Sequence, residues 1–390
     1  MGKHADVVVV GAGILGLAHA WHCAREGLRV VVVERSPRAC GASVRNFGMV
    51  WPVGQRPGTV LRRALRSRDL WLQLLPQAGL WHHREGSLHI ARQEDEWQVL
   101  QEFAALGGGH GYEGRLVSPG DIEHLAPGVL QHGLLGGYWS PTEVGVDPRQ
   151  VVARLPAFLA EHHGVEFRFS TAVTAAGGWG VRAGGEDILA GAVIVCGGTD
   201  FETLYPAEYR ASGLLRCKLQ MMRTAPQPRG WRLGPMIAGG LTLVHYDAFG
   251  ICPSRERLRE NLARELPLHT THGIHVMAAQ NEQGEVVIGD SHEHGLDVSP
   301  FDDPVIDELV LDYLGALVEL PDPRIAARWN GVYARHPDPS RTEFILAPED
   351  NVRLVSFTSG NGMTTSLALA EEVLSGWLLP EEASRPVVTA

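Results

Sequence analysis

The chain has 390 residues, of which 44% are hydrophobic and 20% are charged, and this composition is typical of a globular protein of two or three domains. Its net charge of −11 argues against a nucleic acid partner, because binding to phosphates needs a basic face. No segment approaches the run of about 18 apolar residues that crosses a bilayer, so we expect no membrane span.

The cysteines and the N-terminal residues indicate the compartment. Five scattered cysteines without a CxxC pair predict reduced thiols and neither a disulfide framework nor a zinc site. The apolar run Val7–Val10 is too short for the core of a signal peptide. We therefore expect a cytoplasmic protein. Only Lys3 and Lys218 are lysines, so Lys218 is the realistic candidate for any role that requires one.

The first predicted element is a buried strand at Val7–Val10, an apolar run that ends at glycine. Gly11, Gly13 and Gly16 follow with the GxGxxG spacing. In this pattern the first glycine permits a tight turn, the second lets the backbone approach a pyrophosphate, and the third lets the helix pack closely on the strand. A helix over residues 14–26 would present its N–H groups and positive dipole end to phosphate.

The same unit continues with Gly27, in the position of a helix-ending glycine, and a strand over residues 29–33. Glu34 ends this strand, about 20 residues after the glycines, where a carboxylate binds ribose hydroxyls. The order of strand, glycines, helix, strand and glutamate predicts a dinucleotide site. The alternative is a glycine-rich turn in a purely structural βαβ unit.

Farther along, a loop over residues 35–60 is expected to cross the cofactor. Asp147 and Pro148 predict a helix start, as N-cap and first helical residue. A strand at Ala192–Cys196 runs into two glycines, and Gln283-Gly284 predicts a hairpin. Other helices are predicted over 59–75, 94–106, 148–162, 255–266 and 364–378, and other strands over 87–90, 165–169, 218–223, 275–279, 285–288 and 353–357.

Nucleotide-binding elements thus occur at the start, the middle and the end of the chain, with sheet-rich segments between them. This order predicts an α/β fold: a discontinuous Rossmann-like domain with an inserted α+β substrate domain built on an antiparallel sheet. The expected boundaries are 1–78, 141–215 and 325–390 for the cofactor domain, and 79–140 and 216–324 for the substrate domain.

Four motifs carry a resemblance to a known family. They are the Gly11/Gly13/Gly16 turn with Glu34, the Gly41–Asn46 loop, Val195–Gly198, and Gly360–Met363. With them the chain resembles the D-amino-acid oxidase/glycine oxidase/sarcosine oxidase (DAO) family of FAD-dependent oxidoreductases over nearly its whole length. The resemblance implies FAD, not NAD, because a second glycine-rich strand–helix unit closes the chain.

The resemblance also implies which residues hold FAD. In this family the last glycine motif lies at the flavin, where the following helix N-terminus favours negative charge on the reduced ring. The expected cofactor-binding residues are Gly11, Gly13, Ile14, Leu15, Gly16, Glu34, Arg35, Ala42, Ser43, Arg45, Asn46, Phe47, Gly48, Val173, Cys196, Gly197, Gly198, Gly360, Asn361, Gly362, Met363 and Thr364.

Three family features are missing. The position matched to the cysteine that attaches FAD in sarcosine oxidases is Gly331, two residues before Tyr333, which implies a non-covalent flavin. The oxygen-activating lysine corresponds to Val287, and the substrate-binding lysine to Thr364. Glycine oxidases also lack the first lysine, so dioxygen remains the expected electron acceptor.

Candidates for substrate contact come from the region where the family places active-site side chains. Arg335 is the first candidate for an acidic group, because a guanidinium pairs with a carboxylate or phosphonate through two hydrogen bonds. The alternative for Arg335 is a surface arginine, and for Arg45 a structural ion pair. The full set of candidates is Arg335, Tyr333, Arg45, Tyr246, His275 and Lys218.

Histidines are dense near the predicted substrate sheet. His272, His275, His292 and His294 gather there, but no third ligand has a convincing metal spacing, so we expect no metal. We interpret them as loop histidines, with His275 the best candidate for an anion contact. No general base is evident, and positioning the substrate C–H bond near the flavin is the main expected task.

The resulting hypothesis is FAD-dependent oxidation of a small amine that carries an acidic group, giving an imine that hydrolyses. The segments Gly273–Val276, Ile288–His292 and Val44–Met49 resemble a subgroup linked to aminophosphonate breakdown, which implies aminoethylphosphonate or its N-methyl form. The alternatives are a dehydrogenase that passes electrons to a quinone or carrier, and a flavin-binding protein without turnover. The oligomeric state stays open.

Overall fold

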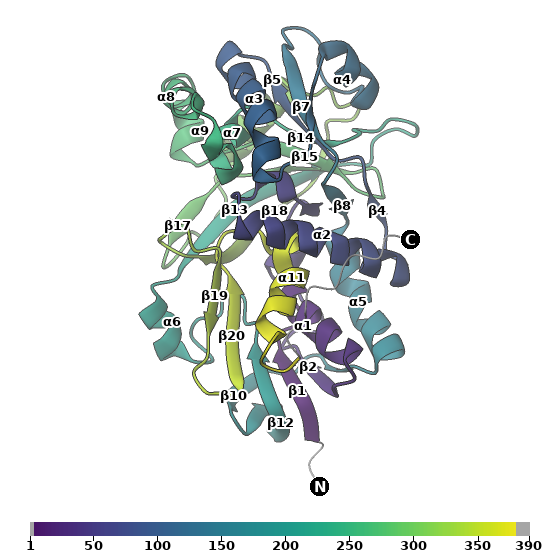
Figure 1. Cartoon of the computed structure of the whole chain (residues 1–390), viewed down its shortest axis with the longest axis vertical. Coiled ribbons are helices and arrows are strands. Elements are labelled where there is room, and N and C mark those ends of the chain that lie inside the picture. Colours follow the sequence, from purple (N-terminus) through teal and green to yellow (C-terminus); the bar gives the residue numbers. More distant parts are fainter. Residues whose placement is uncertain (1–3, 380–390) are drawn as a thin grey trace.

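The computed structural model describes residues 4–379, which form two large sheets (Figure 1). A cavity is lined by residues of both parts. The first sheet has eight strands in the order β10-β11-β12-β1-β2-β9, with β20 on β12 and β19 on β20. Its strands are β1 (His4–Val10), β2 (Val30–Val33), β9 (Glu166–Arg168), β10 (Val173–Gly177), β11 (Gly180–Ala183), β12 (Glu186–Val195), β19 (Glu343–Leu346) and β20 (Val352–Phe357).

The centre of this sheet is parallel, because β9, β2, β1, β12 and β20 all run in one direction. Side chains alternate along a strand, so Val7 and Val9 of β1 pack on one face and Val8 on the other. All three are at most 1% exposed, which explains why the strand reads as continuous valine. The predicted βαβ unit is therefore confirmed as the core of a Rossmann-like sheet.

Helices cover one face of the first sheet and position its glycine turn. The last helix, α11, packs against both α1 and α2, so the first and last described helices lie in one layer (Figure 1). On the opposite face, Tyr209 of α6 and Phe344 of β19 contribute to the core. The helices around this sheet are α1 (Ile14–Arg25), α2 (Thr59–Gln77), α5 (Pro148–His163), α6 (Pro206–Ser212) and α11 (Gly362–Leu374).

The second sheet has nine strands in the order β17-β13-β16-β15-β14-β5-β7-β6, with β18 on β13, and its pairs are antiparallel except β14 with β5. Its strands are β5 (Ser87–Ala91), β6 (Arg115–Val117), β7 (Gly136–Ser140), β13 (Leu215–Thr224), β14 (Met236–Ala238), β15 (Met277–Gln280), β16 (Val286–Gly289), β17 (Glu293–Gly295) and β18 (Ile325–Arg335).

Shorter elements complete the fold. A small third sheet contains β3 (Met49–Val50), β4 (His82–His83) and β8 (Val144–Val146). The helices near the second sheet are α3 (Glu94–Leu106), α4 (Pro119–Leu125), α7 (Leu241–His245), α8 (Arg255–Glu265), α9 (Pro267–Thr271) and α10 (Pro304–Gly315). The 3-10 turns are η1 (Ala42–Val44), η2 (Pro52–Gly54), η3 (Gly107–His110) and η4 (Asp247–Ile251).

The helices and strands expected from the sequence are present, with ends displaced by a few residues. Asp147 caps α5 through the backbone N–H of Arg149, and Gly284 has φ +79° in the turn between β15 and β16. The strand β18 pairs along its length with β13, so residues 325–335 lie in the second sheet. Where one domain ends and the other begins stays a prediction.

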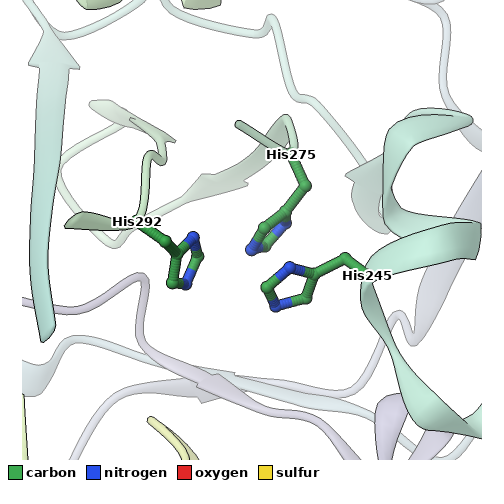
Figure 2. Close-up of side chains that lie close together, drawn as sticks. All are labelled: His245, His275 and His292. Atoms are coloured by element: carbon green, nitrogen blue, oxygen red, sulfur yellow. The ribbon is translucent and has the colours of Figure 1, made fainter. Parts of the chain in front are cut away.

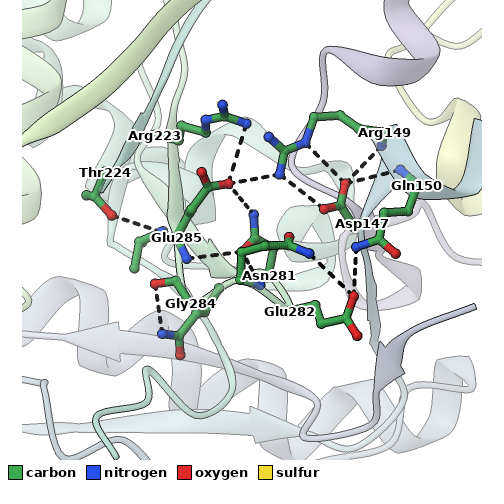
Figure 3. A network of polar contacts seen from close by, with 12 residues as sticks. Asp147, Arg149, Gln150, Arg223, Thr224, Asn281, Glu282, Gly284 and Glu285 are labelled. Atoms are coloured by element: carbon green, nitrogen blue, oxygen red, sulfur yellow. Dashed lines mark hydrogen bonds and ion pairs between the residues drawn. The ribbon is translucent and has the colours of Figure 1, made fainter. Parts of the chain in front are cut away.

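A network of polar contacts joins the two sheets (Figure 3). Arg149, in the first turn of α5, donates to Asp147 at 3.1 Å and to Glu285 of the second sheet at 2.9 Å. Arg223 of β13 lies 3.4 Å from the same Glu285 carboxylate oxygen, and Gln150 donates to Glu282 at 2.7 Å. Asp147 and Glu285 are largely shielded from water, so their bonds to Arg149 fix the β15–β16 hairpin relative to α5. Among residues 4–379, no helix combines the length and apolar character needed to cross a bilayer.

Candidate active site

A cavity of about 870 Å³ extends from the glycine turn after β1 to the second sheet. One end is lined by Gly11–Gly16, the 39–47 loop and residues 359–364 at the start of α11. The other end is lined by side chains of β13 and β18 and by the loops that lead into β15 and β17. Pockets of this size at the switch point of a parallel sheet are typical of dinucleotide or cofactor sites.

The glycine turn has room for backbone only. Gly11 has φ +100°, and a Cβ atom there would lie 2.5 Å from the carbonyl oxygen of Cys196. A Cβ atom on Gly16 would lie 1.9 Å from the carbonyl oxygen of Gly11, so this glycine does permit close helix–strand packing. The Ile14 N–H, in the first turn of α1, donates to Oγ of Ser43 at 3.0 Å, which ties the loop to the helix.

Glu34 faces this turn from the end of β2. Its carboxylate accepts from the Ala12 N–H at 2.9 Å and from the Ser36 N–H at 3.0 Å. The side chain lines the cavity, and each carboxylate oxygen has a second lone pair for a ligand hydroxyl. This position agrees with the ribose-binding role expected from the sequence.

The start of α11 supplies the second half of the cradle. Gly360 has φ +72°, and residues 359–364 line the cavity directly before and within the first turn of the helix. The side chain of Asn361 donates to Gln55 at 3.3 Å, whereas its buried Oδ1 has no hydrogen-bond partner among residues 4–379. A buried acceptor without a partner beside a helix N-terminus indicates a site for a polar ligand group.

The structure brings nearly all of the predicted cofactor residues to the cavity wall. Gly48 is the exception, and its contact with FAD stays a prediction. It lies outside the lining, with φ +78°, and a Cβ atom there would lie 2.0 Å from the carbonyl oxygen of Val146. Its role is the close approach of β8, because only glycine fits against that carbonyl.

The substrate end carries four of the predicted side chains. Arg335, Tyr333, Tyr246 and His275 all line the cavity. Arg335 makes no side-chain ion pair or hydrogen bond with any residue between 4 and 379, so its guanidinium is available for an anion. Burial raises the pKa of Tyr333 and of Tyr246 well above the ordinary value, so both phenols stay protonated.

Tyr246 is part of a fixed aromatic wall. Its hydroxyl donates to Sδ of Met277 at 3.4 Å, and its ring lies 6.1 Å from Trp51 and 5.5 Å from His275, centroid to centroid. These contacts hold the Tyr246 side chain between Met277 and the neighbouring aromatic rings. The expected contact of Tyr246 with the substrate stays a prediction.

Lys218 does not reach the cavity, which corrects its assignment as a candidate ligand. Its ammonium donates to the Phe301 carbonyl and lies 3.0 Å from Asp302. The physical reason is the twofold alternation of β13: Leu219 and Met221 line the cavity, so Lys218 faces the opposite side of the sheet.

Arg45 lines the cavity but is partly used by the protein itself. Its Nε donates to the Cys40 carbonyl at 2.9 Å and its Nη1 to the Asn330 carbonyl at 3.1 Å. Arg45 therefore joins the 40–46 loop to β18. Its contact with a ligand remains a prediction.

Sequence reasoning missed the central member of the histidine group. His245, at the end of α7, lies beside His275 and His292 at the cavity wall (Figure 2). His294 also lines the cavity, whereas His272 does not. The three rings come from distant segments, so no spacing in the sequence indicates that they meet.

Asp290 is a second residue that the sequence did not single out. It lies 2.9 Å from Nε2 of His275, and the two residues also exchange backbone hydrogen bonds. The pair is nearly fully buried and lines the cavity. It places the one strongly buried carboxylate of the described substrate end beside the histidines.

The parallel sheet, its glycine turn and the second sheet over the cavity define a two-part dinucleotide-binding protein. The family model of the DAO FAD dependent oxidoreductases matches residues 6–375. The chain therefore belongs to the DAO family, an FAD-dependent oxidoreductase family, as its motifs indicated.

Curated relatives match part of the chain. The mitochondrial pyruvate dehydrogenase phosphatase regulatory subunit of Mus musculus is 26% identical over 43% of this chain and 19% of its own length. Mitochondrial dimethylglycine dehydrogenase of Rattus norvegicus is 26% identical over 44% of this chain and 20% of its own length. Mitochondrial sarcosine dehydrogenase of Mus musculus is 29% identical over 37% of this chain and 16% of its own length. The chain thus matches about a fifth of these relatives' length.

Solved structures share the whole fold. L-proline dehydrogenase from P. horikoshii superposes with a TM-score of 0.75 at 19% identity, covering 96% of this chain and 93% of the other. Glycine oxidase from Geobacillus kaustophilus gives 0.74 at 17% identity, covering 95% and 94%. L-alpha-glycerophosphate oxidase from Mycoplasma pneumoniae with FAD bound gives 0.71 at 17% identity, covering 95% and 94%.

The residues present fit FAD. The glycine turn and Glu34 suit the adenine dinucleotide part, and the start of α11 with the unpartnered Asn361 oxygen suits the polar edge of the ring. FAD supplies a hydride acceptor to this site when it is bound. The remaining chemistry, which is binding and orienting the substrate, falls to the second sheet.

Proposed function

We propose that this FAD-dependent oxidoreductase oxidises a small primary or secondary amine that carries an acidic group, with an aminophosphonate as the substrate class. Aminoethylphosphonate and its N-methyl form are the simplest members. The observation that carries the proposal is the unpaired Arg335 guanidinium, which lines the same cavity as the FAD cradle. An unpaired cation inside a cavity favours an anionic ligand group.

The polar groups of the substrate end suit a zwitterion. Arg335 and the histidines would hold the acidic group, and Asp290 is a carboxylate for the ammonium end. Apolar side chains, Leu219, Met221 and Met277, line the cavity beside them and exclude water from the C–H bond. Holding that bond in one orientation is the main contribution of such a site to the rate.

The names of the neighbours support an amine substrate and leave its acidic group open. Glycine oxidase, dimethylglycine dehydrogenase and sarcosine dehydrogenase are named for amino acids, whereas the glycerophosphate oxidase is named for a phosphate ester. The position matched to the family's substrate-binding lysine is Thr364, whose hydroxyl accepts from the Trp51 N–H at 3.0 Å. With that lysine absent, the histidines and Arg335 are the remaining donors for an anion.

We propose that FAD is bound without a covalent link. The position matched to the attaching cysteine is Gly331, where a Cβ atom would lie 3.2 Å from the carbonyl oxygen of Arg45. A cysteine there would press on the loop that Arg45 holds. Denaturation in acid followed by filtration tests this point, because a non-covalent flavin passes the filter and a covalent one stays with the protein.

Dioxygen is the proposed electron acceptor, and a quinone or carrier protein is the second candidate. The observation that favours the second is that the described cavity lining contains no lysine, Val287 standing at the matched position. Stopped-flow reoxidation of the reduced protein in air separates the two. Fast reoxidation supports an oxidase, and slow reoxidation that an artificial quinone accelerates supports a dehydrogenase.

The substrate is tested by anaerobic bleaching of the flavin with a panel of amines. Aminoethylphosphonate and its N-methyl form should bleach the flavin at lower concentration than glycine, sarcosine and D-alanine. A clear preference for the amino acids would overturn the aminophosphonate assignment but keep the amine reaction. If no amine bleaches the flavin, the protein binds FAD without turnover.

A further inference from the structure

Three histidines form a stack at the substrate end of the cavity, which we call the histidine stack: His245, His275 and His292 (Figure 2). The ring centroids of His245 and His275 are 3.7 Å apart, those of His245 and His292 are 4.7 Å apart, and those of His275 and His292 are 5.2 Å apart. The interplanar angles are 32°, 40° and 24°. The His275 and His292 rings are thus nearly parallel, whereas the His245 ring is tilted against both.

This arrangement argues against one metal ion held by all three residues. A metal lies in the plane of each imidazole that binds it, so three ligating rings point at a common centre instead of stacking. The unpaired guanidinium of Arg335 at the same end of the cavity favours an anion.

The outer contacts of the stack leave nitrogen atoms for a ligand. His292 uses Nδ1 on the Gly273 carbonyl at 3.0 Å, and His275 uses Nε2 beside Asp290 at 2.9 Å. His245 makes no hydrogen bond with any residue between 4 and 379, and its ring lines the cavity. Because His292 donates from Nδ1, its Nε2 is an acceptor that can take up a proton. The His245 nitrogens and the buried Nδ1 of His275 also have no hydrogen-bond partner among residues 4–379.

Desolvation by the surrounding protein atoms keeps His245 and His292 neutral when no anion is present. It lowers the pKa of His292 to about 4 and that of His245, whose ring is exposed to the cavity, well below its ordinary value, with His275, His292, Arg335 and Arg255 adding to the effect on His245. The opposing charge is Asp290, which raises the pKa of His292. A negative ligand would act as Asp290 does and favour the imidazolium form.

The other polar neighbours of the histidine stack supply no further positive charge that is free to bind an anion. His294 has a pKa lowered by burial and by Arg335, and the phenols of Tyr246 and Tyr333 stay protonated. The guanidinium of Arg255 is held by the carbonyls of residues 243, 244 and 246 at the end of α7. Arg335 is therefore the only cation of the described substrate end without a protein partner.

We propose that the histidine stack is a proton-accepting site for a doubly charged tetrahedral oxyanion, a phosphonate or a phosphate monoester, on the substrate. A single negative charge is met by Arg335, and the second charge draws one proton from solvent onto an imidazole nitrogen of the stack. Only one proton is taken up, because two imidazolium rings at these separations repel each other. The proposal rests on the proposed function, since it specifies the acidic group of that substrate.

The test is titration calorimetry of the FAD-loaded protein with ligands that carry no amine and cannot be oxidised. The ligands are ethylphosphonate, ethyl phosphate, ethanesulfonate and propanoate. Each is titrated in buffers of different ionisation enthalpy, at a pH above the second ionisation of the ligand, so that proton exchange reports the protein. We expect uptake of about one proton with ethylphosphonate or ethyl phosphate, and almost none with the two monoanions.

Variants locate the proton. His245→Gln and His292→Gln should each weaken ethylphosphonate binding by about tenfold and reduce proton uptake, with propanoate affinity changed less than about twofold. His110→Gln, an exposed residue far from the cavity lining, is the control and should change neither quantity. The pH dependence of ethylphosphonate affinity in the unchanged protein gives the same answer without any variant, because affinity should fall as pH rises.

The proposal is overturned if the binding enthalpy of ethylphosphonate shows no buffer dependence, or if propanoate binds more tightly. It is also overturned if EDTA abolishes ethylphosphonate binding and zinc restores it, because a metal would then hold the anion. A preference between ethylphosphonate and ethyl phosphate identifies which source of dianion the site accepts. Failure of the proposed function is distinct, since it would appear as a flavin that no amine bleaches.

Discussion

A side chain at Gly11 would collide with Cys196, because a Cβ atom there would lie 2.5 Å from the Cys196 carbonyl oxygen. This contact joins the end of β1 to the end of β12 at the point where the dinucleotide binds. Gly11→Ala must therefore move one strand end, and it also places alanine at φ +100°. We expect at least about a tenfold loss of FAD affinity, measured from flavin absorbance during dialysis against known FAD concentrations.

Gly27→Ala is the matched control. Gly27 also has positive φ, +82°, but a Cβ atom there meets nothing within 4 Å. It should cost about 1 kcal/mol of stability and leave FAD affinity unchanged. Equal FAD affinity in both variants would mean that the turn does not shape the cofactor site.

Arg335→Met should weaken binding of the acidic substrate group. The guanidinium has no partner among the described residues, so its loss removes a charge-assisted contact without breaking a protein ion pair. We expect an increase in the apparent substrate Kd of about 10- to 100-fold in anaerobic flavin titrations. Arg232→Met, which affects an exposed pair with Glu85, is the control. An unchanged Kd for Arg335→Met would place the acidic group elsewhere.

Lys218→Met should lower the stability of the protein and leave substrate binding unchanged. The ammonium is 3% exposed and holds the loop at residues 301–302 from the side of β13 that faces away from the cavity. We expect a loss of about 1–3 kcal/mol in the free energy of unfolding, measured in urea, with substrate Kd within about twofold. A large change in Kd with unchanged stability would restore Lys218 as a ligand.

Glu285→Gln should loosen the attachment between the sheets. Its carboxylate accepts from Arg149 and lies near Arg223, and its side chain is only 14% exposed. We expect a loss of about 1–3 kcal/mol in the free energy of unfolding, because the guanidinium groups of Arg149 and Arg223 would then face a neutral amide instead of a carboxylate. Asp187→Asn, in the exposed pair with Arg182, is the control and should cost less than about 1 kcal/mol. Equal losses in the two variants would contradict a special role of the network.

His89→Leu should make the protein less sensitive to acid. His89 lies between Trp51 and Phe249, both ring nitrogens are buried without partners, and burial lowers its pKa to about 3. The unfolded chain binds a proton there near pH 6.5 and the folded chain does not, so stability falls as pH drops from about 6.5 toward 3.

The measurement is urea unfolding of both proteins at about pH 7 and about pH 5. The variant should gain stability relative to the unchanged protein at the lower pH, because leucine removes the proton that favours the unfolded chain. Any packing cost of leucine is the same at both pH values and cancels in this comparison. A difference in unfolding free energy that does not change with pH would contradict the assignment.

The βαβ unit and the second glycine motif were predictable because their signals are local. Valine runs, glycine spacing and a terminal glutamate act within one strand, turn and helix, so Gly11, Gly16 and Glu34 take the places that their neighbours in sequence prescribe. The same holds for the cap of α5 at Asp147. The DAO family assignment depends on these local motifs.

Other features depend on contacts between segments far apart in the chain. Gly48 looks like part of the cofactor loop, yet β8 approaches its backbone too closely for any other residue. Lys218 looks like a free lysine, yet the face of β13 on which it lies is set by pairing with β17 and β18. His245 ends α7, whereas His275 and His292 precede β15 and β17, so the three meet only when these elements pack together. Sequence determines the local backbone and so the cofactor turn, whereas strand pairing and packing decide which side chains share the cavity, because those contacts form between residues that no short spacing relates.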